Sequence, residues 1–409
     1  MKILFLNQFF HPDHSATAQI ATDLAEDLAA RGFEVSALAS RGSYLGGGEF
    51  PPRDTYRGVE IHRVRTTSLG KRTLVHRALD YGSFYAAAAA ALVRLPRQDV
   101  VVAMTTPPLI AAAALAARPL RGAKLVYWVQ DLYPEVAVAM GALGARSPAT
   151  LAMAAASRRV MRGADLVVVL GEAMRERVVA AGARRERTTV VPNWSDAAAV
   201  RPVPHAENPL RRELAGDAGC LVMYSGNMGQ GHDIETLLGA ARRLRERRDI
   251  MFLFLGDGAR RGEVEAAARE LANVRLGAYQ PRDQLTNSLS AGDLHLASLD
   301  PGLEGLIEPS KVYGIMAAGR PTLFVGPRGS EVAAMLLREG CGYVIASGDA
   351  DALASHVVRL ADNRIEREEM GHSARLALAA RYSRAVASDR FASLLTSLSS
   401  ASSTAPIAG

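Results

Sequence analysis

Short runs of wholly apolar residues alternate with helical segments along this chain, and this alternation is the feature that most constrains its fold. Lys2–Asn7 is apolar on both faces of the strand it predicts, a helix is expected from about Thr17 to Arg31, and Phe33–Ala39 is the next strand. Strands buried on both faces are typical of parallel sheets that helices cover on either side. The opening therefore predicts an α/β protein of the doubly wound class.

The alternation occurs twice, which predicts two domains. A length of 409 residues is too great for one ordinary hydrophobic core. A stretch of mixed Pro, Asp, Ala and His composition separates the two series and indicates a linker. We therefore predict two doubly wound, Rossmann-like domains over residues 1–193 and 209–380, a linker over 194–208, a helical segment over 381–398 that can cross back to the first domain, and a disordered Ser/Ala-rich tail over 399–409.

The remaining strands follow from further apolar runs. In the first domain they are predicted at Val59–Val64, Val100–Met104, Leu125–Val129, Leu166–Leu170 and Thr189–Val191, and Gly42–Arg57 is expected to be a flexible loop. In the second domain they are predicted at Leu221–Tyr224, Ile250–Leu255, Val274–Leu276, Asp293–Leu299, Thr322–Val325 and Tyr343–Ala346.

Composition and charge restrict the kinds of partner. The net charge of +6, from 48 basic and 42 acidic residues, is a mild excess and does not indicate nucleic acid. Cys220 and Cys341 are far apart without metal-ligand spacing, which favours buried thiols in a reducing compartment. The apolar N-terminal run stops at Pro12, and no run approaches the roughly 18 residues that span a bilayer. We expect a cytoplasmic protein.

The segment Glu304–Pro321 carries the most suggestive local chemistry. It is expected to leave a strand, enter a helix with Pro309 in the first turn, and end at Gly319. Glu308 or Ser310 is expected to cap that turn, which leaves Lys311 near the helix N-terminus. Unpaired amides, a positive dipole end and a lysine together suit a diphosphate. The alternative is an ordinary capped helix in a strand–helix–strand unit.

Glycine turns follow three strands of the second domain. They are Ser225–Gly229, Gly256-Asp257-Gly258 and Gly277. Glycines at these positions let a nucleotide approach the backbone, so their recurrence predicts a nucleotide cleft. The dinucleotide fingerprint GxGxxG is absent, because its third glycine would fall at Arg261.

Polar residues follow two predicted strands of the first domain. His14 and Ser15 lie in the first loop, and Gln130, Asp131 and Glu135 come directly after Leu125–Val129. A carboxylate just past the carboxyl end of a central strand is placed to meet a ligand. Asp131 or Glu135 is therefore a candidate acceptor of sugar hydroxyl hydrogen bonds. The alternatives are helix capping by Ser15 or Thr17 and an N-cap role for Asp131.

Two further patterns have competing interpretations. Asp349-Ala350-Asp351 has the form of a metal-sugar DxD motif, but its place before a predicted helix favours an N-cap. The stretch 63–77 has no acidic residue and precedes Tyr81, Phe84 and Tyr85. Basic residues beside aromatics suit an anionic membrane surface, and the alternative is an ordinary solvated face. The basic residues of this stretch are Arg63, Arg65, Lys71, Arg72 and Arg77.

The order and spacing of several motifs resemble the GT-B glycosyltransferases, over nearly the whole chain. The motifs are NQFFHPDHSATAQIATDLAEDLAARG, YWVQDLYPE, YSGNMGQGHDIETLL, LGDG and PSKVYGIMAAGRP. The closer likeness is to the bacterial retaining enzymes of family 4 that build surface polysaccharides. The resemblance implies two Rossmann-like domains facing a cleft, with a nucleotide-sugar donor in the second domain and an acceptor in the first.

The resemblance also implies roles for individual residues. Gly226 and Asn227 would lie near the diphosphate, as would Lys311, and the Ser310 end of the Glu308–Lys311 turn would meet the diphosphate or ribose. The remaining donor-site candidates are Gly256, Gly258, Tyr279, Gln280, Pro281, Arg282, Leu285 and Pro309, of which the segment from Tyr279 to Leu285 would hold the base.

The chain departs from the family pattern at several positions. Two glutamates of the broad family are replaced by Leu306 and Gly314, so Glu308 or Glu304 becomes the candidate substitute for the ribose contact. A common histidine is replaced by Gln130. The cations usual after the first glycine loop are absent, and Lys311, with Arg282, is the candidate replacement.

The resulting hypothesis is retaining transfer of a hexosyl or N-acetylhexosaminyl group from a nucleotide-diphosphate sugar, expected to be UDP-linked, to a lipid-linked saccharide. Lys311 and Asp131 are the candidate catalytic residues, and neither metal nor cofactor is expected. Two alternatives stay open: a nucleotide-sugar epimerase on the same fold, and a non-catalytic nucleotide-sugar binding subunit.

Overall fold

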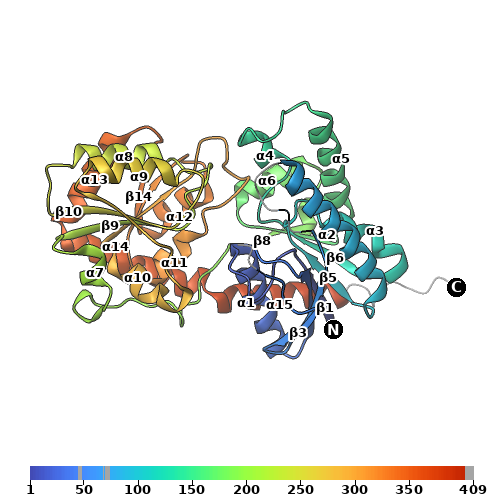
Figure 1. Cartoon of the computed structure of the whole chain (residues 1–409). Helices are drawn as coiled ribbons and strands as arrows, with labels where there is room; N and C mark the ends of the chain where they lie inside the picture. The colour runs from blue at the N-terminus through green and yellow to red at the C-terminus, as the bar shows by residue number, and fades with distance from the viewer. Residues whose placement is uncertain (45–47, 68, 70–73, 401–409) are drawn as a thin grey trace. The chain divides into compact units, whose positions relative to one another are not determined.

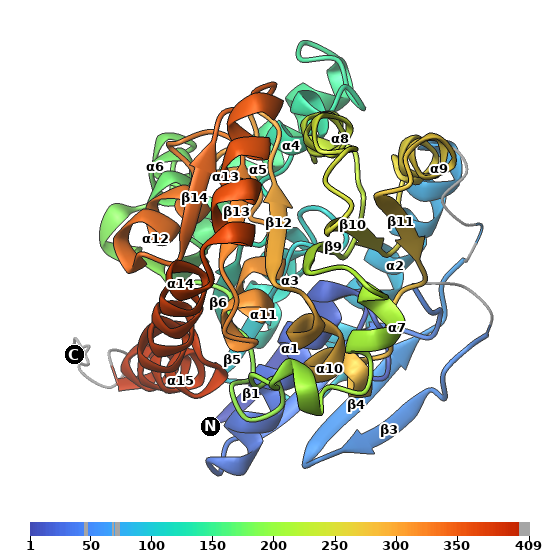
Figure 2. The ribbon, with the colours of Figure 1, turned by 90° about the vertical axis from the view of Figure 1, so that its left-hand side faces the viewer.

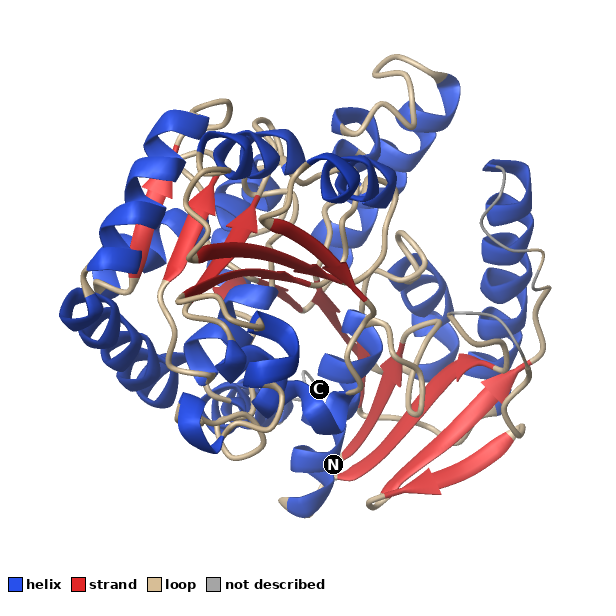
Figure 3. Cartoon of the chain, turned by 60° about the vertical axis from the view of Figure 1, so that its left-hand side comes forward, coloured by secondary structure: helices blue, strands red, loops and turns tan. Residues whose placement is uncertain are grey.

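The computed structural model describes residues 1–44, 48–67, 69 and 74–400 and consists of two compact α/β units (Figure 1). The first unit comprises Met1–Pro192 together with the chain from Ala387 onward, and the second comprises Asn193–Val386. Each is a sheet with helices packed on it, as the red strands and blue helices of Figure 3 show. Both sheets have the predicted doubly wound character, so the fold class is confirmed.

An eight-stranded sheet with the order β3-β4-β2-β1-β5-β6-β7-β8 forms the centre of the first unit. All neighbouring strands pair in parallel except β3, which runs antiparallel to β4. The strand order reverses at β1, where Ile3 pairs with Val35 on one side and Val100 on the other. The strands are β1 Lys2–Leu6, β2 Glu34–Ser40, β3 Arg53–Tyr56, β4 Val59–Val64, β5 Val100–Ala103, β6 Lys124–Trp128, β7 Leu166–Val169 and β8 Thr188–Val190.

The strand β3 corrects the expectation of a flexible loop over Gly42–Arg57. Its residues are polar and alternate between exposed and half-buried positions, so the segment carries no apolar run that would predict a strand. It pairs as an edge strand, with Arg53 opposite His62 and Tyr56 opposite Val59. Edge strands need little apolar surface, because only one side of the ladder is paired.

Helices of the first unit include the last helix of the chain. Trp128 of β6 packs its ring 4.7 Å from that of Phe391, and Ser388 donates a hydrogen bond to Asp27. The C-terminal helix therefore packs on the first unit, and Ser399 and Ser400 are helical, contrary to the predicted tail. The rest of that tail, 401–409, lies outside the described residues. The helices are α1 Ala16–Ala30, α2 Leu74–Arg94, α3 Ala111–Arg121, α4 Glu135–Ala139, α5 Pro148–Gly163, α6 Glu172–Ala180, η1 Arg185–Arg187 and α15 Arg384–Ser400.

The second unit contains a six-stranded parallel sheet with the order β11-β10-β9-β12-β13-β14 (Figure 2). Its chain order reverses between β9 and β12, which makes the carboxyl ends of these two strands the expected ligand position. The strands are β9 Cys220–Ser225, β10 Ile250–Leu255, β11 Val274–Gly277, β12 Leu294–Ser298, β13 Thr322–Val325 and β14 Gly342–Ile345.

Alternate residues of β9 face two different layers of helices. Val222 and Tyr224 pack with α8, α9 and α13, while Leu221 and Met223 pack with α7 and α10. This explains why the strand is apolar throughout. The helices are α7 Arg211–Ala215, α8 Ile234–Arg243, α9 Arg261–Glu270, α10 Leu285–Ala291, α11 Lys311–Ala317, α12 Glu331–Glu339, α13 Ala350–Asp362, α14 Arg364–Ala377, with η2 His205–Glu207, η3 Arg282–Gln284 and the π-helix η4 Leu378–Tyr382.

The predicted linker 194–208 is fastened to the second unit. Arg375 donates hydrogen bonds to the carbonyl oxygens of Ala197 and Val200, and Arg320 donates to that of Val203. Ser195 also pairs with Ser383 in an isolated bridge. These bonds order the linker as part of the second unit.

Candidate functional site

The glycine turns after β9 and β10 meet backbone to backbone in the second unit. Gly226, Gly256 and Gly258 have φ angles of +128°, +136° and +147°, which favour glycine. A Cβ on Gly256 would lie 2.2 Å from the Gly226 carbonyl oxygen, and one on Gly258 would lie 2.5 Å from that of Met228. The glycines are therefore needed for the two turns to approach each other.

Lys311 lies beside this pair of turns. Its Nζ is 3.5 Å from the centroid of the Tyr224 ring, and its Cε is 3.5 Å from the position that a Cβ on Gly226 would occupy. Nζ is buried and has no hydrogen-bond partner among the residues that the structure describes. The sequence-based pairing of Lys311 with the first glycine turn thus has a direct geometric counterpart.

The surroundings of Lys311 support its ammonium form poorly. A cation over a desolvated aromatic ring gains about 2 kcal/mol, whereas removing an ammonium from water costs several kcal/mol. Burial accordingly lowers the pKa of Lys311 well below its usual value. An anion placed at Nζ would restore the proton, because it supplies the missing counter-charge.

His232 and Arg260 are two further basic residues near the glycine turns, and neither offers a free positive charge to an anion. His232 Nδ1 lies 2.7 Å from the Ser298 carbonyl oxygen, and burial, with help from Lys311, lowers the pKa of the imidazole to about 3. The Arg260 guanidinium donates to the His232 carbonyl oxygen and to Glu263. His232 is therefore neutral and Arg260 is already paired.

The helix after Lys311 differs from the prediction at its start. It begins at Lys311 itself, so Pro309 precedes the helix and does not lie in its first turn. Ser310 occupies the N-cap position, but its backbone is helical and its side chain makes no capping bond. Glu308 bonds to a tyrosine instead, so the predicted cap is wrong for both candidates. The helix is only seven residues long, so Lys311 itself carries the local case for an anion.

Glu308 presents one engaged and one unengaged carboxylate oxygen. Tyr313 donates a 2.7 Å hydrogen bond to Oε1, while Oε2 is buried without a partner among the described residues. Burial raises the pKa of Glu308 to about 8. Glu304, the other candidate substitute, accepts a hydrogen bond from the amide of its neighbour Gly302. The structure therefore favours Glu308 as the residue that can still meet a ligand.

Neighbouring side chains fill the space around the two positions where the family has glutamate. Leu306 is buried, and a Cβ on Gly314 would lie 3.2 Å from Cδ1 of Leu289. A longer side chain at Gly314 would have to displace Leu289. Both departures are thus matched by local packing.

The predicted base-binding segment follows β11. Tyr279 is exposed over 63% of its surface, Pro281 and Arg282 are also exposed, and Leu285 begins α10. The Gln280 side chain donates to the Ala278 carbonyl oxygen at 3.4 Å. The segment lies at the same carboxyl edge of the sheet as the glycine turns, and its role stays a prediction.

Polar groups also meet at the carboxyl edge of the first unit's sheet. The Asp131 amide donates to Thr105 Oγ1 at 3.3 Å, and the Gln8 amide donates to the Thr106 carbonyl oxygen at 2.7 Å. Thr106 Oγ1 lies 3.5 Å from Thr17 Oγ1. These contacts join the segments after β1, β5 and β6 to the start of α1.

Asp131 lies at the centre of this edge and does not cap a helix. The following helix α4 starts at Glu135 with Pro134 at its N-cap, so the capping alternative is wrong. Burial raises the pKa of Asp131 to about 6. Glu135 has a buried Oε2 with no partner among the described residues, and Gln130, directly before Asp131, is buried as well.

The two predicted residues of the first loop, His14 and Ser15, have different surroundings. Ser15 is buried and caps α1 by accepting from the Ala18 amide at 3.3 Å, which confirms the capping interpretation. His14 is exposed, and its carbonyl oxygen accepts from Gln19. No contact in the structure joins His14 to Asp131 within the described part of this unit, so His14 rests on the sequence prediction alone.

Sequence reasoning did not assign Tyr224, Thr105 and Thr106 to the site. The Thr-Thr-Pro-Pro run at the end of a strand was a usable signal for the threonines. Tyr224 had no comparable signal, because a tyrosine at the end of a buried strand usually belongs to the core.

The Asp349-Ala350-Asp351 pattern belongs to a helix cap and an ion pair. Asp349 caps α13 by accepting from the Ala352 amide at 2.9 Å, and Asp351 pairs with Arg243. The capping interpretation is confirmed, and among the described residues no group of His, Cys, Asp and Glu side chains suits a metal.

Arg63 does not belong to an exposed basic stretch. It is buried in β4, ion-paired with Asp54 at 3.4 Å, and donates to the His11 carbonyl oxygen. Its use as a membrane contact is therefore wrong. Arg65 is exposed, Lys71 and Arg72 lie outside the described residues, and the side chain of Arg77 is not described. No helix in the described ranges is both long and apolar enough to cross a membrane.

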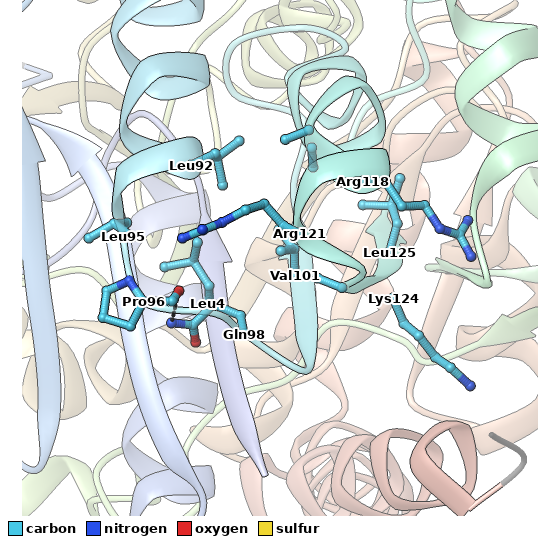
Figure 4. Close-up of a pocket in the computed structure, with 13 residues that line it drawn as sticks. Leu4, Leu92, Leu95, Pro96, Gln98, Val101, Arg118, Arg121, Lys124 and Leu125 are labelled. Atoms are coloured by element: carbon cyan, nitrogen blue, oxygen red, sulfur yellow. Dashed lines mark hydrogen bonds between the residues drawn. The ribbon is translucent and has the colours of Figure 1, made fainter. Parts of the chain in front are cut away.

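A small pocket lies elsewhere, between the ends of α2 and α3 (Figure 4). Leu4, Leu92, Val101, Leu125 and Arg121 are among the residues that line it. It also touches residues at the amino ends of strands, whereas the polar groups above gather at the carboxyl ends. None of the predicted site residues lines it.

Comparison with known proteins gives the class of each half. Residues 15–194 match the glycosyl transferase 4-like domain, and residues 219–363 match glycosyl transferases group 1. The solved sucrose-phosphate synthase of Thermosynechococcus elongatus is 16% identical with a TM-score of 0.79, covering 98% of this chain and 100% of that one. HepE of Anabaena in complex with UDP-glucose is 17% identical with a TM-score of 0.70, covering 97% and 100%. The chain has the two-domain GT-B fold, and each of its two units matches a glycosyltransferase family model.

Two curated relatives refine that class. The probable glycosyltransferase WbjE of Pseudomonas aeruginosa is 30% identical over 214 residues, which are 52% of this chain and 53% of the relative. WcaI of Escherichia coli (strain K12), named as a colanic acid biosynthesis glycosyl transferase, is 33% identical over 138 residues, which are 33% and 34%. The chain spans about half the length of the first relative and about a third of the second.

Proposed function

We propose that the protein transfers a sugar, with retention of anomeric configuration, from a UDP-linked donor in the second unit to a hydroxyl group of a lipid-linked saccharide in the first. The observation that carries the proposal is the buried Lys311 Nζ, which lies beside the glycine turns without a hydrogen-bond partner among the described residues. UDP is favoured because HepE, of the same fold, is described in complex with UDP-glucose.

Lys311 would act on the leaving group. As the bond between sugar and phosphate breaks, the diphosphate gains negative charge, and a fixed cation in a site shielded from water stabilises that charge most. Backbone amides of the glycine turns would add hydrogen bonds. The hydroxyl group of the acceptor would attack from the face of the leaving diphosphate, form the new glycosidic bond and pass its proton to that diphosphate. No metal is required for this scheme.

Asp131 would orient the acceptor. A carboxylate in a poorly hydrated position accepts hydrogen bonds from sugar hydroxyls strongly, and Thr105 fixes its backbone. The transferred sugar is a hexosyl or N-acetylhexosaminyl group in this proposal. A relative is named for colanic acid biosynthesis, which supports a saccharide acceptor, and the lipid link is part of the proposal.

The proposed acceptor also leads to a proposed location. A lipid-linked saccharide lies in a membrane, so we place the protein in the cytoplasm, in peripheral contact with the membrane's inner face. Flotation with vesicles that contain anionic lipid tests the contact, and an Arg65→Glu variant should bind the vesicles less.

The test of the function is turnover of a panel of nucleotide-sugars with and without a lipid-linked saccharide acceptor. Acceptor-dependent release of UDP, with the product's anomeric configuration read by NMR, would support retaining transfer. Conversion of the free donor without acceptor would identify an epimerase instead. Binding of the donor with neither transfer nor hydrolysis would identify a non-catalytic binding subunit.

A further inference from the structure

Neutralising a bound diphosphate does not by itself require that Lys311 be buried. An anion-binding lysine on a surface is hydrated, or paired with a carboxylate, before its ligand arrives. Lys311 Nζ is instead buried against the ring of Tyr224, and no carboxylate is bonded to it among the described residues. The aromatic ring covers the side of Nζ where water or a counter-ion would otherwise lie.

Tyr224 is fixed on several sides. It ends the buried strand β9, its ring stacks on Phe254 with centroids 5.8 Å apart, and its hydroxyl group donates a 2.8 Å hydrogen bond to the Asn227 carbonyl oxygen. One side chain therefore holds both the glycine turn, through its hydroxyl group, and Lys311, through its ring.

Other titratable groups near Lys311 supply no negative charge. His232 packs edge-on against Tyr224 with centroids 6.1 Å apart and is bonded to Ser298. Arg260, bonded to the His232 carbonyl oxygen, adds a positive charge. Glu308, three residues before the lysine, is bonded to Tyr313, and burial raises its pKa to about 8, so that it is protonated at pH 7. The surroundings therefore favour a neutral amine.

We infer that Tyr224 is a positioning residue that stores Lys311 as an uncharged amine beside the glycine turn, and that a diphosphate binds there with uptake of a proton by Lys311. The inference rests on the proposed function, because it takes the diphosphate of the donor as the ligand. It adds that donor affinity is linked to proton concentration and falls as pH rises. Burial, which lowers the pKa of Lys311, agrees with this.

The test is calorimetry of UDP binding at pH 8 in Tris and in HEPES, whose ionisation enthalpies differ. At this pH the second ionisation of a phosphate, near about pH 6, is complete, so UDP itself takes up little. We expect measurable proton uptake, of at most one proton for each UDP bound. Uridine, which lacks the diphosphate, should give none, and Lys311→Met should bind UDP at least about tenfold more weakly and without uptake.

The role of Tyr224 has its own readout. Tyr224→Phe keeps the ring and should keep the uptake, with about threefold weaker UDP binding from the lost hydrogen bond. Tyr224→Leu removes the ring, lets water reach Nζ, and should reduce the uptake by at least half. If the leucine variant fails to fold, Tyr224→Met, whose flexible side chain fills the space, takes its place.

Four outcomes overturn the inference. UDP binding without uptake would mean that Lys311 is charged from the start. Uptake that persists in Lys311→Met would assign the proton to another group, such as Glu308, whose pKa of about 8 leaves it half protonated at the pH of the test. Uptake unchanged when the ring is removed would deny Tyr224 its role. These three leave the proposed function intact, whereas absence of UDP binding would remove both.

Discussion

The carboxyl edges of the two sheets carry opposite chemistry. In the second unit, two glycine turns bring backbone together and a buried lysine has no hydrogen-bond partner among the described residues. In the first unit, Thr17, Thr105 and Thr106 contribute hydroxyl groups that are bonded to one another or to backbone, and Asp131 contributes a carboxylate. One edge suits an anion and the other suits the hydroxyl groups of a sugar. The contrast teaches that one architecture can present different chemistry at equivalent edges, and in the proposed function it would divide donor from acceptor.

The largest effect is expected from removing the cation. Lys311→Met should lower transfer about a hundredfold or more at saturating donor, because the leaving diphosphate loses its fixed positive charge. Steady-state kinetics measure it. Lys2→Met is the matched control, since Lys2 is an exposed lysine paired with Glu34, and it should leave transfer unchanged. Unchanged turnover in Lys311→Met would show that another group neutralises the diphosphate.

The glycine turns should be the next most sensitive feature. Gly256→Ala brings a Cβ into the Gly226 carbonyl oxygen at a positive φ, and we expect a loss of about 2–4 kcal/mol of unfolding free energy together with loss of UDP binding.

Substitutions at two other glycines distinguish a loss of fold stability from a loss of UDP binding at the turn. Gly371→Ala creates a similar clash, 2.2 Å from the Gly319 carbonyl oxygen, outside the turns. It should destabilise the fold while the folded fraction still binds UDP. Gly262→Ala, which meets nothing within 4 Å, should change neither. Equal loss of UDP binding in Gly256→Ala and Gly371→Ala would refute the special role of the turn.

On the first unit, Asp131→Asn should separate acceptor from donor. We expect transfer to fall about ten- to hundredfold, the cost of a lost hydrogen bond to a charged group, with UDP affinity unchanged. Because burial raises the pKa of Asp131 to about 6, the wild-type transfer rate should rise as the pH increases through 6. The transfer rate of the variant should not show this rise.

Stability of the first unit should respond in the opposite sense. The folded state holds the Asp131 proton more tightly than the unfolded chain, whose carboxyl titrates near about 3.9. Wild-type stability should therefore decline between about pH 4 and pH 6, and less so in Asp131→Asn. An identical pH dependence of unfolding in both proteins would contradict the assignment.

A smaller effect is expected at Glu308. Its pKa of about 8 means that the side chain is protonated at pH 7, so Glu308→Gln should change UDP affinity there by no more than about threefold. Above pH 8 the wild-type carboxylate would repel the diphosphate, and the glutamine variant should then bind UDP more tightly than wild type. Titration calorimetry at pH 7 and pH 9 decides this.

The smallest effect is expected at the former metal-motif candidate. Asp349→Ala removes the α13 cap and should cost about 1 kcal/mol of unfolding free energy with no change in transfer or UDP binding. A loss of activity that added metal restores would revive the metal-sugar interpretation.

The sequence predicted the sheets well because their strands are buried on both faces and therefore wholly apolar. It missed β3, whose polar residues Arg53–Tyr56 form an edge, and it placed Arg63 on the surface because a charged residue in a strand gives no sign of a buried partner such as Asp54. The start of α11 was misplaced because Pro309 and Ser310 both suit a first turn.

The site was only partly visible for a similar reason. Lys311 and the glycine turns share chemistry that a sequence displays, whereas the contact of Lys311 with Tyr224 joins residues 87 positions apart. The free oxygen of Glu308 likewise depends on Tyr313, which binds the other one. Pairings of this kind follow from packing and leave no local pattern.

Thermal unfolding of wild type and Lys311→Met against a panel of nucleotide-sugars and nucleotides tests the central claim most directly. A ligand at a hundred times its dissociation constant stabilises a protein by about 2.7 kcal/mol, so a true donor should raise the melting temperature clearly. The account predicts a shift with UDP and one UDP-sugar in wild type, and a much smaller shift in the variant. No shift with any nucleotide, or equal shifts in both proteins, would contradict it.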